Sequence, residues 1–197
     1  MDAAAPGFRS LTAKVARVQY TAIINEKSED GGTVYVLRSK GKDMRFLIEF
    51  DRPAPRFVLF ADRKAQVFHP RSNVVQEVDL GQQKGLVEQF LLLGFGVPGK
   101  ELSKSYQVAY KGDETIAGQK TSHLELTPKS EAVRQHYNKI ELWIDSSGRY
   151  PVRQKLTEPS GNYWLVTYTD VQWNPDLKPE QTALKLPPNV KREYPQR

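Results

Sequence analysis

The sequence predicts a mainly β, α+β protein built on one antiparallel sheet of about eleven strands. Three observations support this fold class. Short segments alternate apolar and polar residues, turn residues separate them at short intervals, and only a few segments have helical spacing. No internal repeat or long linker divides the 197 residues, so we expect a single domain over residues 1–197.

The first predicted element is a helix over residues 8–18. Phe8, Leu11, Val15 and Val18 recur at the spacing of one helical face, and Ser10 precedes most of them. The first strand is expected directly after this helix, within residues 18–27, where β-branched residues and two-residue alternation begin.

The sheet is expected to occupy residues 18–175, followed by a C-terminal tail over 176–197. Every second residue from Met44 to Phe50 is apolar, whereas Arg45 and Glu49 lie between them. This alternation is typical of a strand with one face in water. The other strands are expected at residues 33–38, 56–61, 65–70, 74–80, 105–112, 122–128, 139–145, 151–158 and 162–173.

Two further helices interrupt the strands. One spans 84–93, where the sequence reads LVEQFLLLGFG from Leu86 onwards, and a shorter polar one spans 130–137. Two short helices cannot bury both faces of such a sheet, so the sheet could curl into an incomplete barrel whose apolar concave face needs a cover. Helices 8–18 and 84–93 are the available covers. Helix 84–93 is then either a detachable lid, flanked by hinge-like glycines, or a permanent part of the core.

Charge and composition exclude several classes of protein. The net charge is +6, yet basic residues are spread through the turns and no run of five or six like charges occurs, which disfavours nucleic-acid binding. The absence of cysteine removes disulfides, cysteine-ligated zinc and cysteine nucleophiles. No apolar segment is long enough to span a membrane.

The polar residues form no recognisable catalytic or metal-binding pattern. His69, His123 and His136 fall on three different predicted elements without metal-ligand spacing, and no nucleophile elbow or phosphate-binding glycine loop occurs. We therefore expect no enzyme activity, no cofactor and no metal site.

The segment FADRKAQVFHPRSNVVQEVDL, residues 60–80, resembles a central motif of the bacterial outer-membrane lipoprotein carriers, the LolA-like family. The matching residues are Asp62-Arg63-Lys64 leading to Phe68-His69-Pro70. Further similarity lies in residues 126–129, 140–145 and 151–152, and the order of elements agrees from residue 8 to about 175.

The resemblance implies a strongly curved antiparallel half-barrel that short helices cover as a lid. It also implies a monomeric periplasmic carrier, peripheral to membranes, that shields lipoprotein acyl chains between an inner-membrane transporter and an outer-membrane acceptor. The start MDAAAPG would suit a chain whose signal peptide has been removed, with a cytosolic start as the alternative. The same fold serves envelope sensors and protein-interaction domains that recognise lipoproteins or a membrane partner without carrying lipid, which is the alternative function.

Candidate site residues follow from the alternation and from the resemblance. The cavity lining is predicted to comprise Val34, Val36, Met44, Phe46, Ile48, Leu59, Leu124, Leu126, Leu142 and Ile144. The lid face is predicted to comprise Leu86, Phe90, Leu91 and Phe95. Family members hold the lid shut with an arginine, for which Arg38 and Arg45 are the candidates here; both could instead lie at the rim of the cavity.

Overall fold

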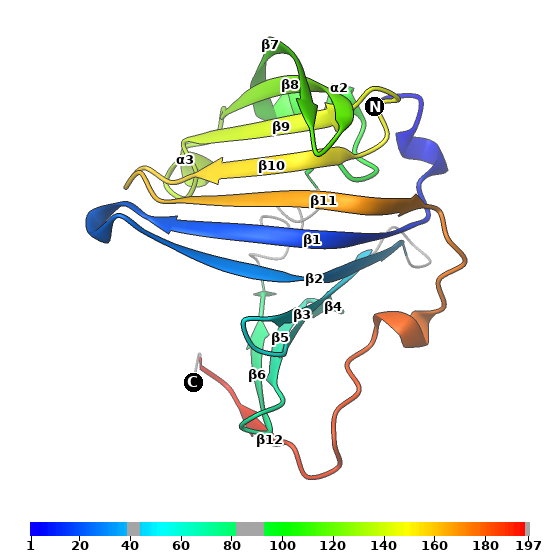
Figure 1. The fold of residues 1–197 in the computed structure, drawn as a ribbon, viewed down its shortest axis with the longest axis vertical. Coiled ribbons are helices and arrows are strands. Elements are labelled where there is room, and N and C mark those ends of the chain that lie inside the picture. Colours follow the sequence, from blue (N-terminus) through cyan, green and yellow to red (C-terminus); the bar gives the residue numbers. More distant parts are fainter. Residues whose placement is uncertain (39–43, 82–92, 196–197) are drawn as a thin grey trace. The chain divides into compact units, whose positions relative to one another are not determined.

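The structure, a computed structural model, describes residues 1–38, 44–81 and 93–195, and it is mainly β. Within these residues, twelve strands are hydrogen-bonded in the order β12-β6-β5-β4-β3-β2-β1-β11-β10-β9-β8-β7, which does not close into a barrel. The strands are β1 (Ser10–Thr21), β2 (Glu26–Arg38), β3 (Met44–Arg52), β4 (Arg56–Ala61), β5 (Lys64–His69), β6 (Val74–Asp79), β7 (Tyr106–Ile116), β8 (Gln119–Pro128), β9 (Lys139–Asp145), β10 (Pro151–Thr157), β11 (Tyr163–Trp173) and β12 (Lys191–Glu193). Figure 1 shows the elements along the chain.

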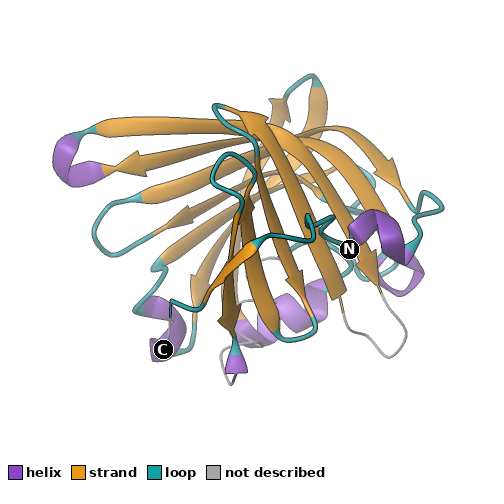
Figure 2. Ribbon diagram, turned by 90° about the horizontal axis from the view of Figure 1, so that it is seen from below, coloured by secondary structure: helices purple, strands orange, loops and turns teal. Residues whose placement is uncertain are grey.

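Helices are few and short in the part of the chain that the structure describes (Figure 2). They are α2 (Gly99–Ser105), α3 (Glu131–Arg134) and the 3-10 turns η1 (Ala5–Gly7), η2 (Ala22–Ile24) and η4 (Pro179–Thr182). Helix α3 lies inside the helix predicted over 130–137. Helix α2 begins at Gly99, one of the glycines predicted to form a hinge-like flank of helix 84–93. The lid helix predicted over 84–93 lies outside the described residues, apart from its last residue.

The chain forms two compact units, which are described separately. One, here called the β9 unit, comprises residues 1–8, 15–29 and 92–169 and holds β7 to β10 with most of β11. The other, here called the β3 unit, comprises residues 9–14, 30–91 and 170–197 and holds β3 to β6, β12 and most of β2.

The helix predicted over residues 8–18 is wrong, because these residues form most of strand β1. Leu11, Ala13 and Val15 are each at most 5% exposed, whereas Lys14 and Ala16 are exposed. Burial therefore repeats every two residues, as it does in a strand with one buried face. Leu11 and Val15 fit both the spacing of a helix and the two-residue period of a strand, so the sequence alone did not distinguish the two.

The ten strands predicted between residues 33 and 173 are confirmed as β2 to β11, with boundaries that differ by a few residues. Antiparallel pairing fixes which residues share a face. In the β3 unit, β3 pairs with β2 and β4, so that Phe46 lies opposite both Val36 and Phe60. In the β9 unit, β8, β9 and β10 pair in sequence order, and Leu142 lies opposite Leu124 and Gln154.

The C-terminal tail is described up to residue 195 and belongs to the β3 unit. Its turn η4 contacts β3 through Arg45, whose Nε and Nη2 each donate to the Thr182 carbonyl oxygen at 3.4 Å. Its strand β12 then pairs in parallel with β6, placing Lys191 opposite Val74. This short strand is additional to the predicted ones, and it covers the edge of β6.

Candidate functional site

An apolar surface in the β3 unit is formed by one face of β2, β3 and β4. Cross-strand pairing joins Val34 to Ile48 and Val36 to Phe46, and Ile48 in turn lies opposite Val58 on β4. Val34, Val36 and Phe46 are at most 4% exposed. Met44 and Ile48 are half-buried. Five of the predicted lining residues therefore share one face, here called the β3 apolar face.

Leu59 lies on the other face of this sheet, unlike the five residues with which it was grouped. It pairs with Leu47, which pairs with Tyr35, whereas the β3 apolar face is built from the alternate positions of the same strands. Leu59 is nevertheless buried, at 5% exposure. Both faces of β4 carry apolar residues, so alternation along this strand does not distinguish the two faces.

The β9 unit presents a second apolar surface, on β8, β9 and β10. Leu124 lies opposite Leu142, Leu126 opposite Ile140, and Ser122 opposite Ile144. The four predicted residues of this unit therefore share one face, here called the β9 apolar face. Leu126, Leu142 and Ile144 are at most 4% exposed, whereas Leu124 is half-buried.

A buried polar contact lies on the β9 apolar face and was missed by the sequence analysis. The Tyr168 hydroxyl donates to Gln154 Oε1 at 2.9 Å, and Gln154 Nε2 donates to the Leu93 carbonyl oxygen. The rings of Phe95 and Tyr168 are perpendicular, in an edge-to-face contact with centroids 5.2 Å apart. The signal in the sequence was Gln154 itself, a polar residue two positions before the apolar Leu156 on the same face of β10.

These contacts show where the end of the predicted lid segment lies. Leu93 and Phe95 are both 1% exposed and pack within the β9 unit. Gly94, between them, has a φ of +89°, and a side chain there would crowd the Pro151 ring at 3.1 Å. The position of Phe95 is thus fixed by its ring contact with Tyr168 and by the hydrogen bond from Gln154 to the Leu93 carbonyl oxygen. The other predicted lid residues, Leu86, Phe90 and Leu91, lie outside the described residues.

The two candidate latch arginines occupy opposite faces of the β3 unit. Arg38 pairs with Met44 and follows Val34 and Val36 on alternate positions, which places it at the end of the β3 apolar face. Arg45 lies on the other face, where its Nη1 is 3.2 Å from Asp62 Oδ2. Arg45 also binds the C-terminal segment through the Thr182 carbonyl oxygen.

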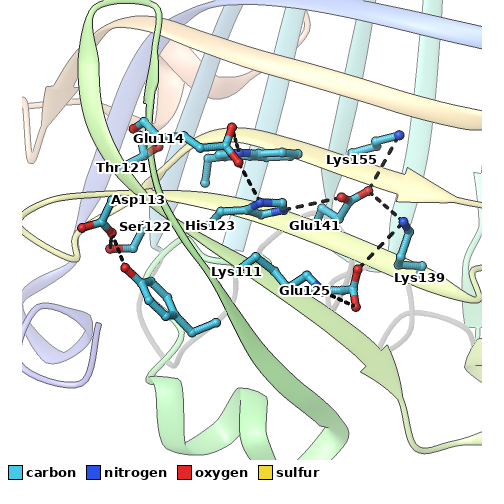
Figure 3. A network of polar contacts seen from close by, with 12 residues as sticks. Lys111, Asp113, Glu114, Thr121, Ser122, His123, Glu125, Lys139, Glu141 and Lys155 are labelled. Carbon is cyan, nitrogen blue, oxygen red and sulfur yellow. Dashed lines mark hydrogen bonds and ion pairs between the residues drawn. The ribbon is translucent and has the colours of Figure 1, made fainter.

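The opposite face of the β9 unit is polar and charged (Figure 3). His123 stacks on Trp143 with ring centroids 4.3 Å apart, and its Nδ1 lies 2.9 Å from Glu114 Oε1. Glu141 lies within 4 Å of Lys139 and Lys155. Alternate positions of β8 to β10 therefore carry apolar residues on one face and ion pairs on the other. Among the described residues, no group of three or more histidines and carboxylates is placed to hold a metal ion.

Comparison with known sequences gives little information. One family model, described only as an uncharacterized protein, matches residues 97–173. No curated protein matches. In residues 1–38, 44–81 and 93–195, no helix has both the length and the apolar character needed to cross a membrane.

Solved structures give a clearer result. The chain is similar to an uncharacterized conserved protein from Thermus thermophilus, at 14% identity, with 94% and 90% of the two chains covered and a TM-score of 0.58. It is similar to the Mycobacterium tuberculosis lipoprotein LppX, at 14% identity, 89% and 92% coverage and a TM-score of 0.52. MucB in the Pseudomonas aeruginosa MucA/MucB complex also matches, at 16% identity and a TM-score of 0.52, with 92% of this chain and 58% of that chain covered.

A LolA superfamily protein from Nitrosomonas europaea is among the matching structures as well, at 18% identity, 89% and 90% coverage and a TM-score of 0.39. That score is too low to support an argument by itself. The three matches with TM-scores above 0.5 support the LolA-like fold that the resemblance in the sequence implied. At these identities they establish the fold alone.

Proposed function

We propose that this protein is a periplasmic carrier that binds the acyl chains of lipoproteins, or of another lipid, on its apolar sheet faces and ferries them towards the outer membrane. It would act without enzymatic chemistry, as a monomer peripheral to membranes. An inner-membrane transporter would supply the cargo and an outer-membrane acceptor would receive it.

The observation that carries this proposal is the pair of apolar faces. Each is continuous over three strands and includes side chains that remain half-buried, among them Ile48 in the β3 unit and Leu124 in the β9 unit. Half-buried apolar side chains can lose further water contact against a ligand. Each acyl methylene removed from water contributes about 0.8 kcal/mol, so a chain of a dozen methylenes can bind without any polar contact.

The fold supports the same class of function. LppX is a lipoprotein, and the resemblance seen in the sequence is to carriers of lipoproteins. Such proteins belong to the bacterial envelope, which is the basis for proposing a periplasmic location.

The test compares two leucines that differ in face. Leu124 and Leu165 are both half-buried in the β9 unit, but Leu124 lies on the apolar face, whereas Leu165 pairs with Lys155 on the charged face. Binding of a fluorescent fatty acid should fall about tenfold or more in Leu124→Asp and remain near the wild-type value in Leu165→Asp. Circular dichroism would show that both variants fold.

A complementary measurement asks whether the purified protein already holds lipid. Organic-solvent extraction followed by mass spectrometry should detect acylated molecules in the wild-type protein. If no lipid copurifies and the fatty-acid probe shows no saturable binding, the carrier function is wrong.

The second candidate is a sensor or protein-interaction domain, and the observation in its favour is the match to MucB in a complex with MucA. This function predicts that a protein partner, rather than a lipid, is captured from envelope extracts. It also predicts equal partner binding by the wild type and Leu124→Asp.

A further inference from the structure

The β3 unit contains a pocket of about 350 Å³. Two arginines contribute to its lining, so the pocket is not a purely apolar cavity. It lies where the start of β1, the end of β2 and the segment after β11 meet. Its lining comprises Arg9, Ser10, Leu37, Arg38, Asn174, Pro175, Asp176 and Leu177. The volume falls within the range of small-molecule binding sites.

The two arginines are brought together by strand pairing. The Arg38 amide donates to the Arg9 carbonyl oxygen at 2.8 Å, so the two residues lie opposite each other. The contact between Lys14 Nζ and Thr33 Oγ1, at 3.1 Å, agrees with the same antiparallel register. Opposite residues of antiparallel strands point to the same face, and both arginines line this pocket.

A set of backbone contacts fixes the third wall of the pocket. Asn174, with a φ of +57°, accepts hydrogen bonds through Oδ1 from the amides of Arg9 and Ser10, at 2.8 and 3.2 Å. Its own amide donates to the Ser10 carbonyl oxygen at 2.9 Å. The Ser10 hydroxyl, in turn, donates to the Pro175 carbonyl oxygen at 2.5 Å. These four hydrogen bonds hold the pocket independently of its charged side chains.

The pocket lies at the end of the β3 apolar face. Arg38 is the next inward position after Val34 and Val36 on β2, and Arg9 precedes Leu11 by two residues at the start of β1. Met44, which pairs with Arg38 on the same face, is half-buried. Two guanidinium groups thus stand at the end of two apolar rows, which is the arrangement that an amphiphile with an anionic head requires.

We propose that the pocket between Arg9 and Arg38 binds a phosphate group, and that this phosphate is the headgroup of a lipid whose acyl chain lies along the β3 apolar face. A guanidinium group can donate two parallel hydrogen bonds to the oxygens of a phosphate, and two such groups line the pocket beside the single carboxylate of Asp176. The acyl part of this inference rests on the proposed function, whereas the phosphate part does not.

The test uses three probes in calorimetric titrations at low salt and below micelle-forming concentrations. They are myristoyl lysophosphatidic acid, monomyristoylglycerol and inorganic phosphate. The first two share one acyl chain and differ in charge. Wild-type protein should bind the lysophosphatidic acid about tenfold more tightly than the neutral lipid, the effect of roughly one charge-assisted contact. The preference should decrease as salt is raised.

Variants of the pocket residues test whether the preference for the phosphate lipid arises in the pocket. Arg9→Gln and Arg38→Gln should each bring the two lipid affinities close together while leaving binding of the neutral lipid unchanged. Asp176→Asn should strengthen binding of the phosphate lipid. Arg71→Gln, the same change at an exposed turn residue of the β3 unit, is the matched control and should behave as the wild type. Thermal unfolding would check that each variant folds.

The outcomes separate this inference from the proposed function. Equal affinity of wild-type protein for the two lipids would overturn the phosphate pocket and leave the carrier function standing. A loss of both lipids in Arg38→Gln would assign Arg38 to the closure of the apolar face and also overturn the pocket. Saturable binding of inorganic phosphate that Arg9→Gln abolishes, without any binding of lipid, would support the pocket and contradict both the lipid headgroup and the carrier.

Discussion

The Tyr168 hydroxyl donates a 2.9 Å hydrogen bond to Gln154 Oε1, and both residues are only 4% exposed. Gln154 extends this hydrogen-bond chain, because its amide nitrogen donates to the Leu93 carbonyl oxygen. A buried polar chain thus attaches residues 93–95 to the sheet of the β9 unit.

Tyr168→Phe should lower the free energy of unfolding by about 1–3 kcal/mol, because it leaves a buried amide oxygen without its donor. Urea unfolding measures the loss. In a double-mutant cycle with Gln154→Leu, the two changes should show positive coupling, since each removes the same hydrogen bond. Simple additivity would show that the hydroxyl and the amide do not interact.

Alkaline pH should destabilise the protein in a way that depends on Tyr168. Complete burial raises the pKa of this phenol well above its ordinary value of 10.0. The folded state keeps the proton where the unfolded chain loses it, so the stabilising contribution is full below pH 10 and declines as the pH rises above 10. Urea unfolding between about pH 9 and 11 should show a weaker decline in Tyr168→Phe than in the wild type. Parallel curves would contradict the shift.

Arg45→Leu should loosen the C-terminal segment without affecting cargo. The guanidinium contacts both the Thr182 carbonyl oxygen and the Asp62 carboxylate, and losing them should lower the local opening free energy by about 1 kcal/mol. Hydrogen exchange in residues 179–183 should therefore be faster, with Arg71→Leu as the control. Binding of the fatty-acid probe should respond more to Arg38→Leu than to Arg45→Leu, because only Arg38 lies in the pocket at the end of the apolar face, where it can meet the carboxylate of the probe.

Lys191→Pro should increase self-association through β6. The Lys191 amide donates to the Asn73 carbonyl oxygen at 3.0 Å, and proline removes this donor, at a cost of about 1 kcal/mol. An uncovered strand edge pairs readily with another chain. Sedimentation velocity should detect dimers in Lys191→Pro, whereas Lys191→Ala, which keeps the amide, should remain monomeric. Dimers in both variants would point to the lost charge instead.

Strands β2 to β11 could be predicted from the sequence because turn residues mark their ends and alternation marks their faces. The same alternation was hidden in β1, where Leu11 and Val15 also fit helical spacing. Strand β12 left no signal, since three residues are too few to show a period and a parallel partner 117 positions away cannot be read locally.

The site was predicted incompletely for similar physical reasons. Nine of the ten proposed lining residues fall on the apolar faces of their own units, because inward positions repeat every two residues. Leu59 fell on the other face of β4, where the residues on both faces are apolar. The contact of Gln154 with Tyr168 depends on tertiary pairing, so only the polarity of an inward residue could have indicated it.

The pairing of β12 with β6 also has a consequence for biosynthesis. The ribosome completes residues 74–79 long before it reaches residues 191–193, so a nascent chain exposes this strand edge throughout the synthesis of the intervening segment. Any partner that binds such edges has that interval in which to engage the chain, and its release requires residues 191–193 to have left the ribosome and paired with β6.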